Sequence, residues 1–360
     1  MLKTYLILFL ISMSFIITNC VPDIQKTDDI YLSYKSTQDT SLTLYANFFK
    51  PKKPSPIIVW MHGWHGRAKR RSADDVPPSL SKEWFLIQPD MRGRADSEGK
   101  QDCNGWELQD IVDAVEFAKK EYPNLISNPE RICLIGGSGG GGNVLGLVGK
   151  FPDYFSAALA EFVISDYGMW YRADTLKKEF RDEMETKGWI GGSPSNNAEA
   201  YRSRGGLTTV ENLLTPLAII HGDRDIRVQV EQARAYVEKA KQVGTSNHIN
   251  YLELPGVGAY IKGAHWENAT KEQKQAKVQL TKNHFAKNLS PIEIPRSGKF
   301  IVTGYLKTKH FEVILESIDN IGEIIYNLDK DEYIVKSNSS KTAIIKIKKD
   351  GNWETKIITL

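Results

Sequence analysis

The chain has few cysteines, little net charge and no sequence repeat, and each of these absences excludes a class of protein. Its 360 residues include three cysteines, too few for a disulfide-built domain or a cysteine zinc site, and Cys103 and Cys133 either stay thiols or form one bridge. Its formal net charge is +3, from 47 basic and 44 acidic residues, which gives no argument for nucleic-acid binding. It shows no fixed-period repeat and no low-complexity tract, which excludes solenoid and fibrous architectures. We expect an ordinary globular protein with one large core and a small second domain, and with no metal, cofactor or nucleic-acid partner.

Long apolar runs are also absent, apart from one at the N-terminus. After Lys3, an almost uninterrupted apolar run covers Tyr5–Ile17, which is typical of a secretion signal and too short for a comfortable membrane span. Cys20 follows, as in bacterial lipoprotein signals, although Asn19 stands where a small residue is usual. We therefore expect residues 1–20 to be a signal peptide and Cys20 to carry a lipid that anchors the exported protein to a bacterial membrane, the outer membrane being favoured. An unlipidated signal peptide and an uncleaved anchor are the alternatives.

Beyond a polar linker at residues 21–29, strands and helices are expected to alternate. A hairpin comes first, formed by the alternating segments 30–36 and 41–49. Continuous apolar runs typical of buried parallel strands then cover residues 56–62, 84–90, 131–136, 156–164, 216–222 and 249–255. Helical patterns cover residues 106–120, 229–242 and 267–288. The alternation predicts an α/β domain over residues 30–290, with a mostly parallel sheet and helices on both faces.

Two segments depart from this alternation. Residues 165–215 are polar with aromatic side chains at intervals. Such an insertion either covers a pocket or is a surface segment without a role in binding. Residues 291–360 contain short strand patterns separated by Asn, Asp, Gly and Ser. They predict a separate small all-β domain, arranged as a sandwich. Its lysines form either a solvated face or a site for an acidic polymer.

The stretch "RICLIGGSGGGGNVLGLVG" at residues 131–149 leads from a strand into a helix, and two chemistries fit it. A dinucleotide fingerprint would use Gly137, Gly139, Gly142 and, further on, Glu161. A nucleophile elbow would use Gly136, Ser138 and Gly140. A dinucleotide fingerprint usually opens its domain, whereas a hairpin and two buried strands come first here. The position therefore favours Ser138 as a nucleophile.

The partners that a serine nucleophile needs follow in the chain order typical of α/β hydrolases. Asp225 lies just beyond the strand predicted at 216–222, where an acid could orient a histidine, and Asp223 is its local rival. His265 lies in a glycine-containing loop after the last strand of the sheet. We expect Ser138, Asp225 and His265 to form a catalytic triad.

Backbone N–H groups are the candidates for the oxyanion hole, the set of donors that stabilises the negatively charged intermediate. The N–H of Gly139 opens the helix after the serine, where the helix dipole adds to the attraction. Trp64 lies in "MHGWHG", the turn after a buried strand, and its N–H is the second candidate. Five of the other histidines are expected to serve in turns, in packing or on the surface: His62, His65, His248, His284 and His310.

Taken together, these segments make residues 31–288 resemble α/β hydrolases of the prolyl oligopeptidase type, which are related to bacterial acyl esterases. "PDMRGRADSEG" resembles the family's D-x-R-G-x-G-x-S loop, with Ala95 in place of the second glycine. "GGSGGGG", "TPLAIIHGDRD" and "GAHW" resemble its nucleophile, acid and histidine segments. The resemblance implies an α/β-hydrolase fold and assigns the triad to Ser138, Asp225 and His265.

Two departures from the family lean away from a peptide-specific enzyme. The oligopeptidases carry a large N-terminal propeller, whereas only a short stretch separates Cys20 from Pro56. They also place a tyrosine hydroxyl in the oxyanion hole, and residues 57–66 contain no tyrosine. We therefore expect a serine hydrolase that cleaves carboxylic esters, with acyl groups on a carbohydrate or another polymer as candidate substrates. A peptidase acting on amides and a non-catalytic surface protein on the same fold are the alternatives.

Overall fold

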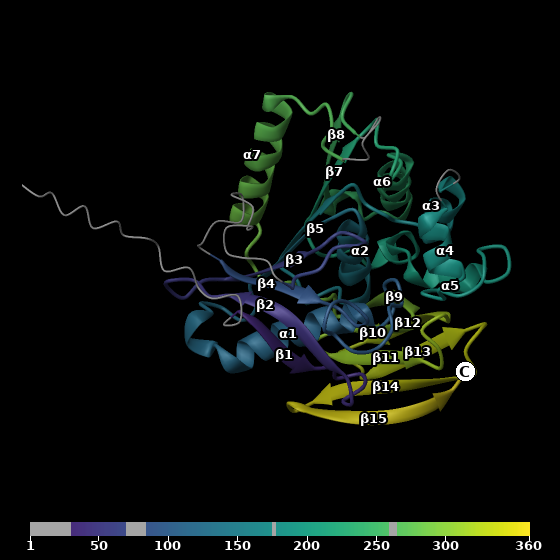
Figure 1. Cartoon of the computed structure of the whole chain (residues 1–360). Coiled ribbons are helices and arrows are strands. Elements are labelled where there is room, and N and C mark those ends of the chain that lie inside the picture. Colours follow the sequence, from purple (N-terminus) through teal and green to yellow (C-terminus); the bar gives the residue numbers. More distant parts are fainter. Residues whose placement is uncertain (1–29, 70–83, 175–177, 259–264) are drawn as a thin grey trace, which may run out of the picture.

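The computed structural model describes residues 30–69, 84–174, 178–258 and 265–360 (Figure 1). The expected signal peptide with Cys20 and the linker at 21–29 lie outside these residues. Among the helices of the described part, none combines the length and the apolar composition that a membrane crossing requires.

The first sheet has eight strands in the order β1-β2-β4-β3-β5-β6-β7-β8. They are β1 (Tyr31–Lys35), β2 (Thr43–Phe49), β3 (Ile57–Met61), β4 (Phe85–Asp90), β5 (Ile132–Gly137), β6 (Ala157–Glu161), β7 (Leu217–Gly222) and β8 (Ile249–Leu254). In this order, each neighbouring pair from β4–β3 to β7–β8 is parallel. The pairs β1–β2 and β2–β4 are antiparallel. The central strands are buried on both faces, which explains their unbroken apolar sequences. The predicted mostly parallel sheet with an edge hairpin is confirmed.

Helices cover both faces of this sheet (Figure 1). The helices are α1 (Glu107–Glu121), α2 (Gly139–Lys150), α6 (Glu231–Val243) and α7 (Lys271–Lys287), with short 3-10 turns η4 (Pro123–Leu125) and η6 (Ser246–His248). Apolar side chains of α1, α2 and α6 share one core with Ile57 and Val59, while Phe285 of α7 packs with Ile58 on the opposite face. The capping box of Thr270 and Gln273 fixes the start of α7, later than its apolar pattern suggested.

The described part of residues 165–215 forms short helices and contains no strand. These are α3 (Tyr167–Ala173), α4 (Glu179–Glu185), α5 (Ala198–Arg204) and the 3-10 segment η5 (Gly206–Asn212). Their aromatic side chains, including Trp170, Phe180 and Tyr201, form a core of their own around Trp64. The insertion therefore packs on the loop that follows β3.

The C-terminal residues form a second sheet, in the order β13-β12-β9-β10-β11-β14-β15, and every neighbouring pair is antiparallel. Its strands are β9 (Ser297–Thr303), β10 (Tyr305–Lys307), β11 (Phe311–Leu315), β12 (Ile321–Asn327), β13 (Glu332–Ser337), β14 (Thr342–Lys349) and β15 (Asn352–Thr359). The predicted sandwich is wrong, because this is one sheet whose inward side chains share one core. Gly304, at φ +70, separates β9 from β10, and a Cβ there would lie 2.7 Å from the backbone of Ile318, so glycine is required at this position.

The second sheet shares buried contacts with the α/β part. Tyr305 belongs to the larger core, where its ring stacks on Trp106 with centroids 4.5 Å apart. The buried Lys150 of α2 donates to the hydroxyl of Thr303 at 2.8 Å and also to its carbonyl. The expected separate unit therefore rests on α1 and α2 through specific contacts.

Both described cysteines are buried and free, so the alternative of a bridge between Cys103 and Cys133 is wrong. Burial raises the pKa of both thiols. An inert packing role follows for each of them.

Candidate active site

Ser138 occupies a strained turn between β5 and α2. Its backbone has φ 58 and ψ −122, a conformation that residues with a Cβ rarely adopt. Its N–H donates to the carbonyl of Glu161 at 2.9 Å, and its carbonyl accepts from Gly142 at 3.0 Å. These bonds hold the turn and lift the serine side chain off the end of the sheet.

The surrounding glycines are explained by close packing of α2 against neighbouring strands. A Cβ on Gly140 would lie 2.6 Å from the carbonyl oxygen of Met61, and one on Gly141 would lie 2.6 Å from that of Glu161. The side chain of Glu161, the acid of the alternative dinucleotide fingerprint, lies 2.8 Å from Lys277 Nζ as an ion pair. The glycine-rich loop thus serves steric needs that do not involve a phosphate.

Gly140→Ala and Gly137→Ala should have opposite effects on stability. A methyl group on Gly140 meets the backbone oxygens of Met61 and His62 at 2.6 and 2.8 Å, so we expect a loss of about 3 kcal/mol, the upper end of overpacking effects. At Gly137 the nearest atom would be 3.6 Å away, so Gly137→Ala should be neutral or stabilising by about 0.4–1 kcal/mol. Urea unfolding of both variants tests this expectation. Equal destabilisation by the two substitutions would contradict the packing explanation.

Asp225 and His265 meet beyond the carboxyl ends of β7 and β8. His265 Nδ1 lies 2.5 Å from Asp225 Oδ2, and the Asp225 side chain is buried. The other carboxylate oxygen accepts the backbone N–H groups of Arg227 at 2.9 Å and Val228 at 3.2 Å. Asp223 accepts the N–H of Gly256 instead. The structure therefore brings Asp225, not its rival, to the histidine.

Phe162 holds the ring of His265 in place, a contact that the sequence did not indicate. The two rings stack with centroids 4.8 Å apart, and Trp266 meets the edge of Phe162 at 5.1 Å. Phe162 is buried and has φ 50, a rare conformation for so large a side chain. It comes directly after β6, and the sequence pattern only predicted that it continues that strand.

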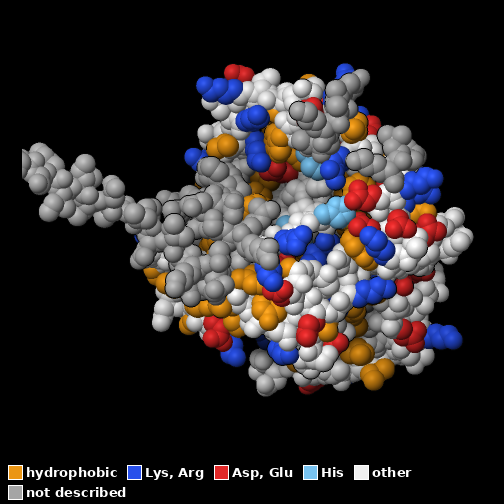
Figure 2. All heavy atoms as spheres, in the orientation of Figure 1, with side chains coloured by type: hydrophobic (Ala, Val, Ile, Leu, Met, Phe, Trp, Pro, Cys, Tyr) orange, Lys and Arg blue, Asp and Glu red, His pale blue; other side chains and the backbone are white. Residues whose placement is uncertain are grey.

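Ser138 and His265 line one pocket of about 430 Å³. Its lining also includes Trp60, Trp64, Glu161, Phe162, Trp266 and Lys277. Figure 2 shows histidine side chains at a recess near the middle of this face, with lysine and arginine side chains beside it. Asp225 lies behind His265, so the three predicted triad residues come together at one edge of the sheet.

The two candidate oxyanion donors are neighbours in space. A Cβ on Gly139 would lie 2.6 Å from the backbone nitrogen of Trp64, so these two peptide groups are in close contact. The Trp64 indole donates to Glu183 at 2.5 Å and lies among the aromatic rings of the insertion, with Trp170 at 4.8 Å. The insertion therefore fixes the backbone of this loop.

The loop after β4 also supports Trp64. Arg94, for which the sequence predicted no role, donates to the carbonyl of Trp64. Ala95, which stands where the family pattern has glycine, has φ 48, so a left-handed residue is needed at this position.

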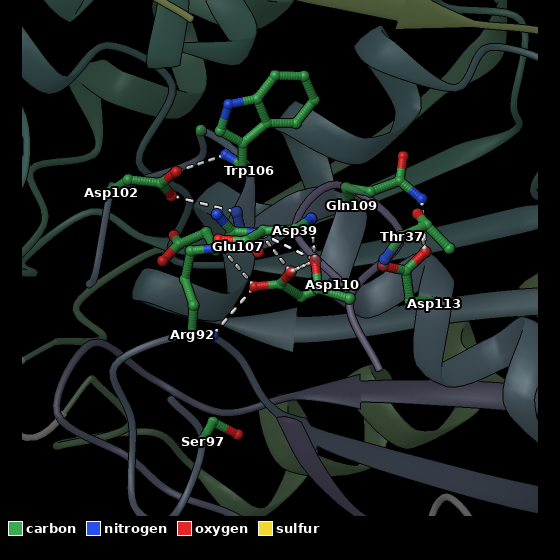
Figure 3. A network of polar contacts seen from close by, with 12 residues as sticks. Thr37, Asp39, Arg92, Ser97, Asp102, Trp106, Glu107, Gln109, Asp110 and Asp113 are labelled. Atoms are coloured by element: carbon green, nitrogen blue, oxygen red, sulfur yellow. Dashed lines mark hydrogen bonds and ion pairs between the residues drawn. The ribbon is translucent and has the colours of Figure 1, made fainter. Parts of the chain in front are cut away.

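Arg92 ties this loop to α1. Figure 3 shows Arg92 reaching Asp110, to which its side chain donates at 2.6 and 2.7 Å. Burial raises the pKa of Asp110 to about 6 even though Arg92 opposes the shift. Asp102 accepts the N–H groups of Trp106 and Glu107 at the start of the helix. These polar contacts fix the loop that carries Arg94.

The other histidines have structural partners. His62 is buried with Nδ1 2.8 Å from the carbonyl oxygen of Gly63, and His65 lies 3.0 Å from Glu183. His284 is buried in α7 near the carbonyl oxygen of Pro216. His62 and His65 also line the pocket at Ser138. In the described residues, no group of His, Cys, Asp and Glu side chains is arranged to hold a metal ion.

Known proteins resemble this chain over the same region. Residues 77–289 match the prolyl oligopeptidase family. Esterase LipC of Mycobacterium tuberculosis is 26% identical over 222 residues, which are 58% of this chain and 53% of that protein. The uncharacterized peptidase YtmA of Bacillus subtilis is 28% identical over 167 residues, or 45% of this chain and 60% of that protein.

Among solved structures, an acylaminoacyl peptidase of Pyrococcus horikoshii superposes with a TM-score of 0.60 at 22% identity, covering 74% of this chain and 42% of that one. This likeness shows a shared fold. The chain spans 53% and 60% of the two curated relatives named above.

Proposed function

This chain belongs to the prolyl oligopeptidase family of serine hydrolases, and we propose that it cleaves carboxylic esters, including acyl groups on a carbohydrate. The observation that carries the proposal is the Asp225–His265 contact of 2.5 Å in the pocket that Ser138 lines. A nucleophile on a strained turn, a base and an acid that orients the base are the parts that acyl transfer requires.

In the proposed reaction, His265 takes the proton of Ser138 while the serine oxygen attacks the ester carbonyl. The N–H groups of Gly139 and Trp64 stabilise the oxyanion, and the adjacency of these two peptide groups supports their pairing. His265 then donates the proton to the leaving alcohol, which produces an acyl-enzyme. Water, deprotonated by His265, releases the acid and restores Ser138.

Apolar walls and a paired carboxylate in the described lining favour an ester over a peptide with a free amino terminus. Trp60, Phe162 and Trp266 give it apolar walls. Glu161 is the carboxylate among its described lining residues, and it is already bound by Lys277 at 2.8 Å and by the Trp266 indole at 3.3 Å. A paired carboxylate is poorly placed to bind the free amino terminus of a peptide. Similarity to peptidases keeps peptide cleavage as the second candidate.

The preference for esters should appear in matched substrates. We expect kcat/KM for p-nitrophenyl acetate to exceed that for acetylated-aminoacyl and dipeptidyl p-nitroanilides. The reason is that the described lining of the pocket offers apolar contacts, and that its carboxylate, Glu161, is already paired with Lys277. An anilide turned over with equal or higher kcat/KM would favour the peptidase. A folded protein that does not react with a fluorophosphonate would instead support the non-catalytic alternative.

We also propose export with a lipid on Cys20, which rests on the N-terminal sequence. Metabolic labelling with palmitate tests this, and a Cys20→Ser protein that still carries the label would contradict it.

A further inference from the structure

A second and larger pocket, of about 560 Å³, lies between α1 and the second sheet. Gln109 and Asp113 of α1 form part of one wall, Asp153 follows α2, and Lys346 and Trp353 come from β14 and β15. Among the described residues, it shares no lining residue with the pocket at Ser138. The proposed hydrolysis therefore does not account for it.

The charges of this second pocket balance. Five lysines and five carboxylates line it, and many of them are paired within it. The paired nitrogens and oxygens include Lys119 and Glu116 at 2.8 Å, Lys309 and Glu130 at 3.0 Å, and Lys346 and Glu312 at 3.2 Å. Pairing leaves little net positive charge to attract an acidic polymer. The pocket therefore suits a neutral, polar ligand.

Two buried oxygen acceptors among the residues that line the pocket have no hydrogen-bond partner in the described part of the chain. The amide nitrogen of Gln109 donates to Asp113 at 2.7 Å, and Figure 3 shows its oxygen turned away from Asp113 and Thr37. Asp153 accepts the N–H of Lys309 at 3.0 Å through Oδ2 only. Gln109 Oε1 and Asp153 Oδ1 receive no hydrogen bond from the described residues, although the two residues are only 4% and 2% exposed. Buried acceptors of this kind call for a donor, and both residues line the pocket.

Trp353 adds an aromatic surface to the same pocket. Its side chain is 43% exposed, and Lys348 Nζ lies 5.9 Å from its ring centroid. Ligand sites commonly combine an exposed aromatic surface with a few fixed polar groups. A sugar ring matches both features, because its C–H face can lie on an indole while its hydroxyls donate to acceptors at the side.

We propose that this pocket binds a neutral carbohydrate chain, with a sugar ring on Trp353 and hydroxyl groups donating to Gln109 and Asp153. Binding here does not depend on the reaction at Ser138. A polymer held in this pocket would keep the catalytic domain near its substrate.

Affinity electrophoresis of the full-length chain in detergent tests the proposal, using native gels that contain xylan, glucomannan, mixed-linkage β-glucan or the anionic polymer alginate. We expect at least one neutral polymer to retard the protein, and Trp353→Ala to weaken this binding at least tenfold. Asp153→Asn keeps the shape of the side chain but can turn an amide donor toward the ligand, so it should weaken binding as well.

The matched control is Ile357→Ala, on the same strand but outside the pocket lining, where the side chain is 76% exposed. It should leave retardation unchanged, and so should Ser138→Ala. The proposal is overturned if no neutral polymer retards the protein, if alginate alone does so, or if a folded Trp353→Ala protein binds as the native chain does. A native chain that binds a neutral carbohydrate but does not hydrolyse esters would count against the catalytic proposal alone.

Discussion

Ser138→Ala should lower kcat/KM for p-nitrophenyl acetate by on the order of 10⁴–10⁶-fold, because it removes the atom that forms the acyl-enzyme. The strained turn itself should persist, since alanine has the same Cβ as serine and the backbone bonds to Glu161 and Gly142 remain. Labelling by a fluorophosphonate should disappear together with turnover. Steady-state kinetics, gel-based labelling and thermal unfolding measured on the same preparation check this expectation.

Ser193→Ala provides the matched control for this experiment. Ser193 lies in the loop before α5, where its hydroxyl contacts Ser195, and its loss should leave labelling and turnover intact. A folded Ser138→Ala protein that is still labelled, or that keeps most of its activity, would remove Ser138 from the reaction.

Asp225→Asn should lower kcat on the order of 10⁴-fold. The cause would be a change in which nitrogen of His265 carries the proton, and not a loss of structure. Asp225 Oδ1 accepts two backbone N–H groups, so an asparagine would keep its oxygen there. Its NH₂ group would then face His265 Nδ1, which has to accept instead of donate. The proton of the neutral imidazole would move to Nε2, and His265 could no longer take the proton of Ser138 through that atom.

The matched control is Asp223→Asn. Among the described residues, Asp223 accepts the N–H of Gly256, which an asparagine oxygen can also accept, so turnover should stay close to the native rate. Stopped assays on p-nitrophenyl acetate, with unfolding curves for both variants, distinguish the two acids. An active Asp225→Asn protein beside an inactive Asp223→Asn protein would reverse the assignment.

The sequence predicts the first sheet well because buried parallel strands carry an unbroken apolar signal. In β7, for example, every residue is buried, so the strand could be predicted without deciding which of its faces is exposed to solvent. The second sheet was harder to predict. Alternation shows that Phe300 and Ile345 face inward, but it does not say whether their strands belong to two sheets or to one, because that depends on pairing between distant strands.

At the candidate site, too, some features could be predicted from the sequence and others could not. Ser138, Asp225 and His265 could be chosen because each follows a recognisable strand and has a side chain suited to the chemistry. The contacts that position them could not. Phe162 on His265 and Arg94 on Trp64 join residues far apart in the chain, and nothing in their local sequence distinguishes them from ordinary packing or surface residues.

The buried contact between Lys150 and Thr303 means that the parts of the chain before and after residue 290 depend on each other for stability. Burial lowers the pKa of Lys150, and its amine depends on oxygens of the second sheet for its hydrogen bonds. Removing that sheet would leave this amine without these hydrogen bonds and would expose the face of Trp106 on which Tyr305 stacks. The helix that begins beside Ser138 is the one that ends at Lys150, so an intact C-terminal sheet also stabilises the far end of the helix on which the nucleophile turn rests.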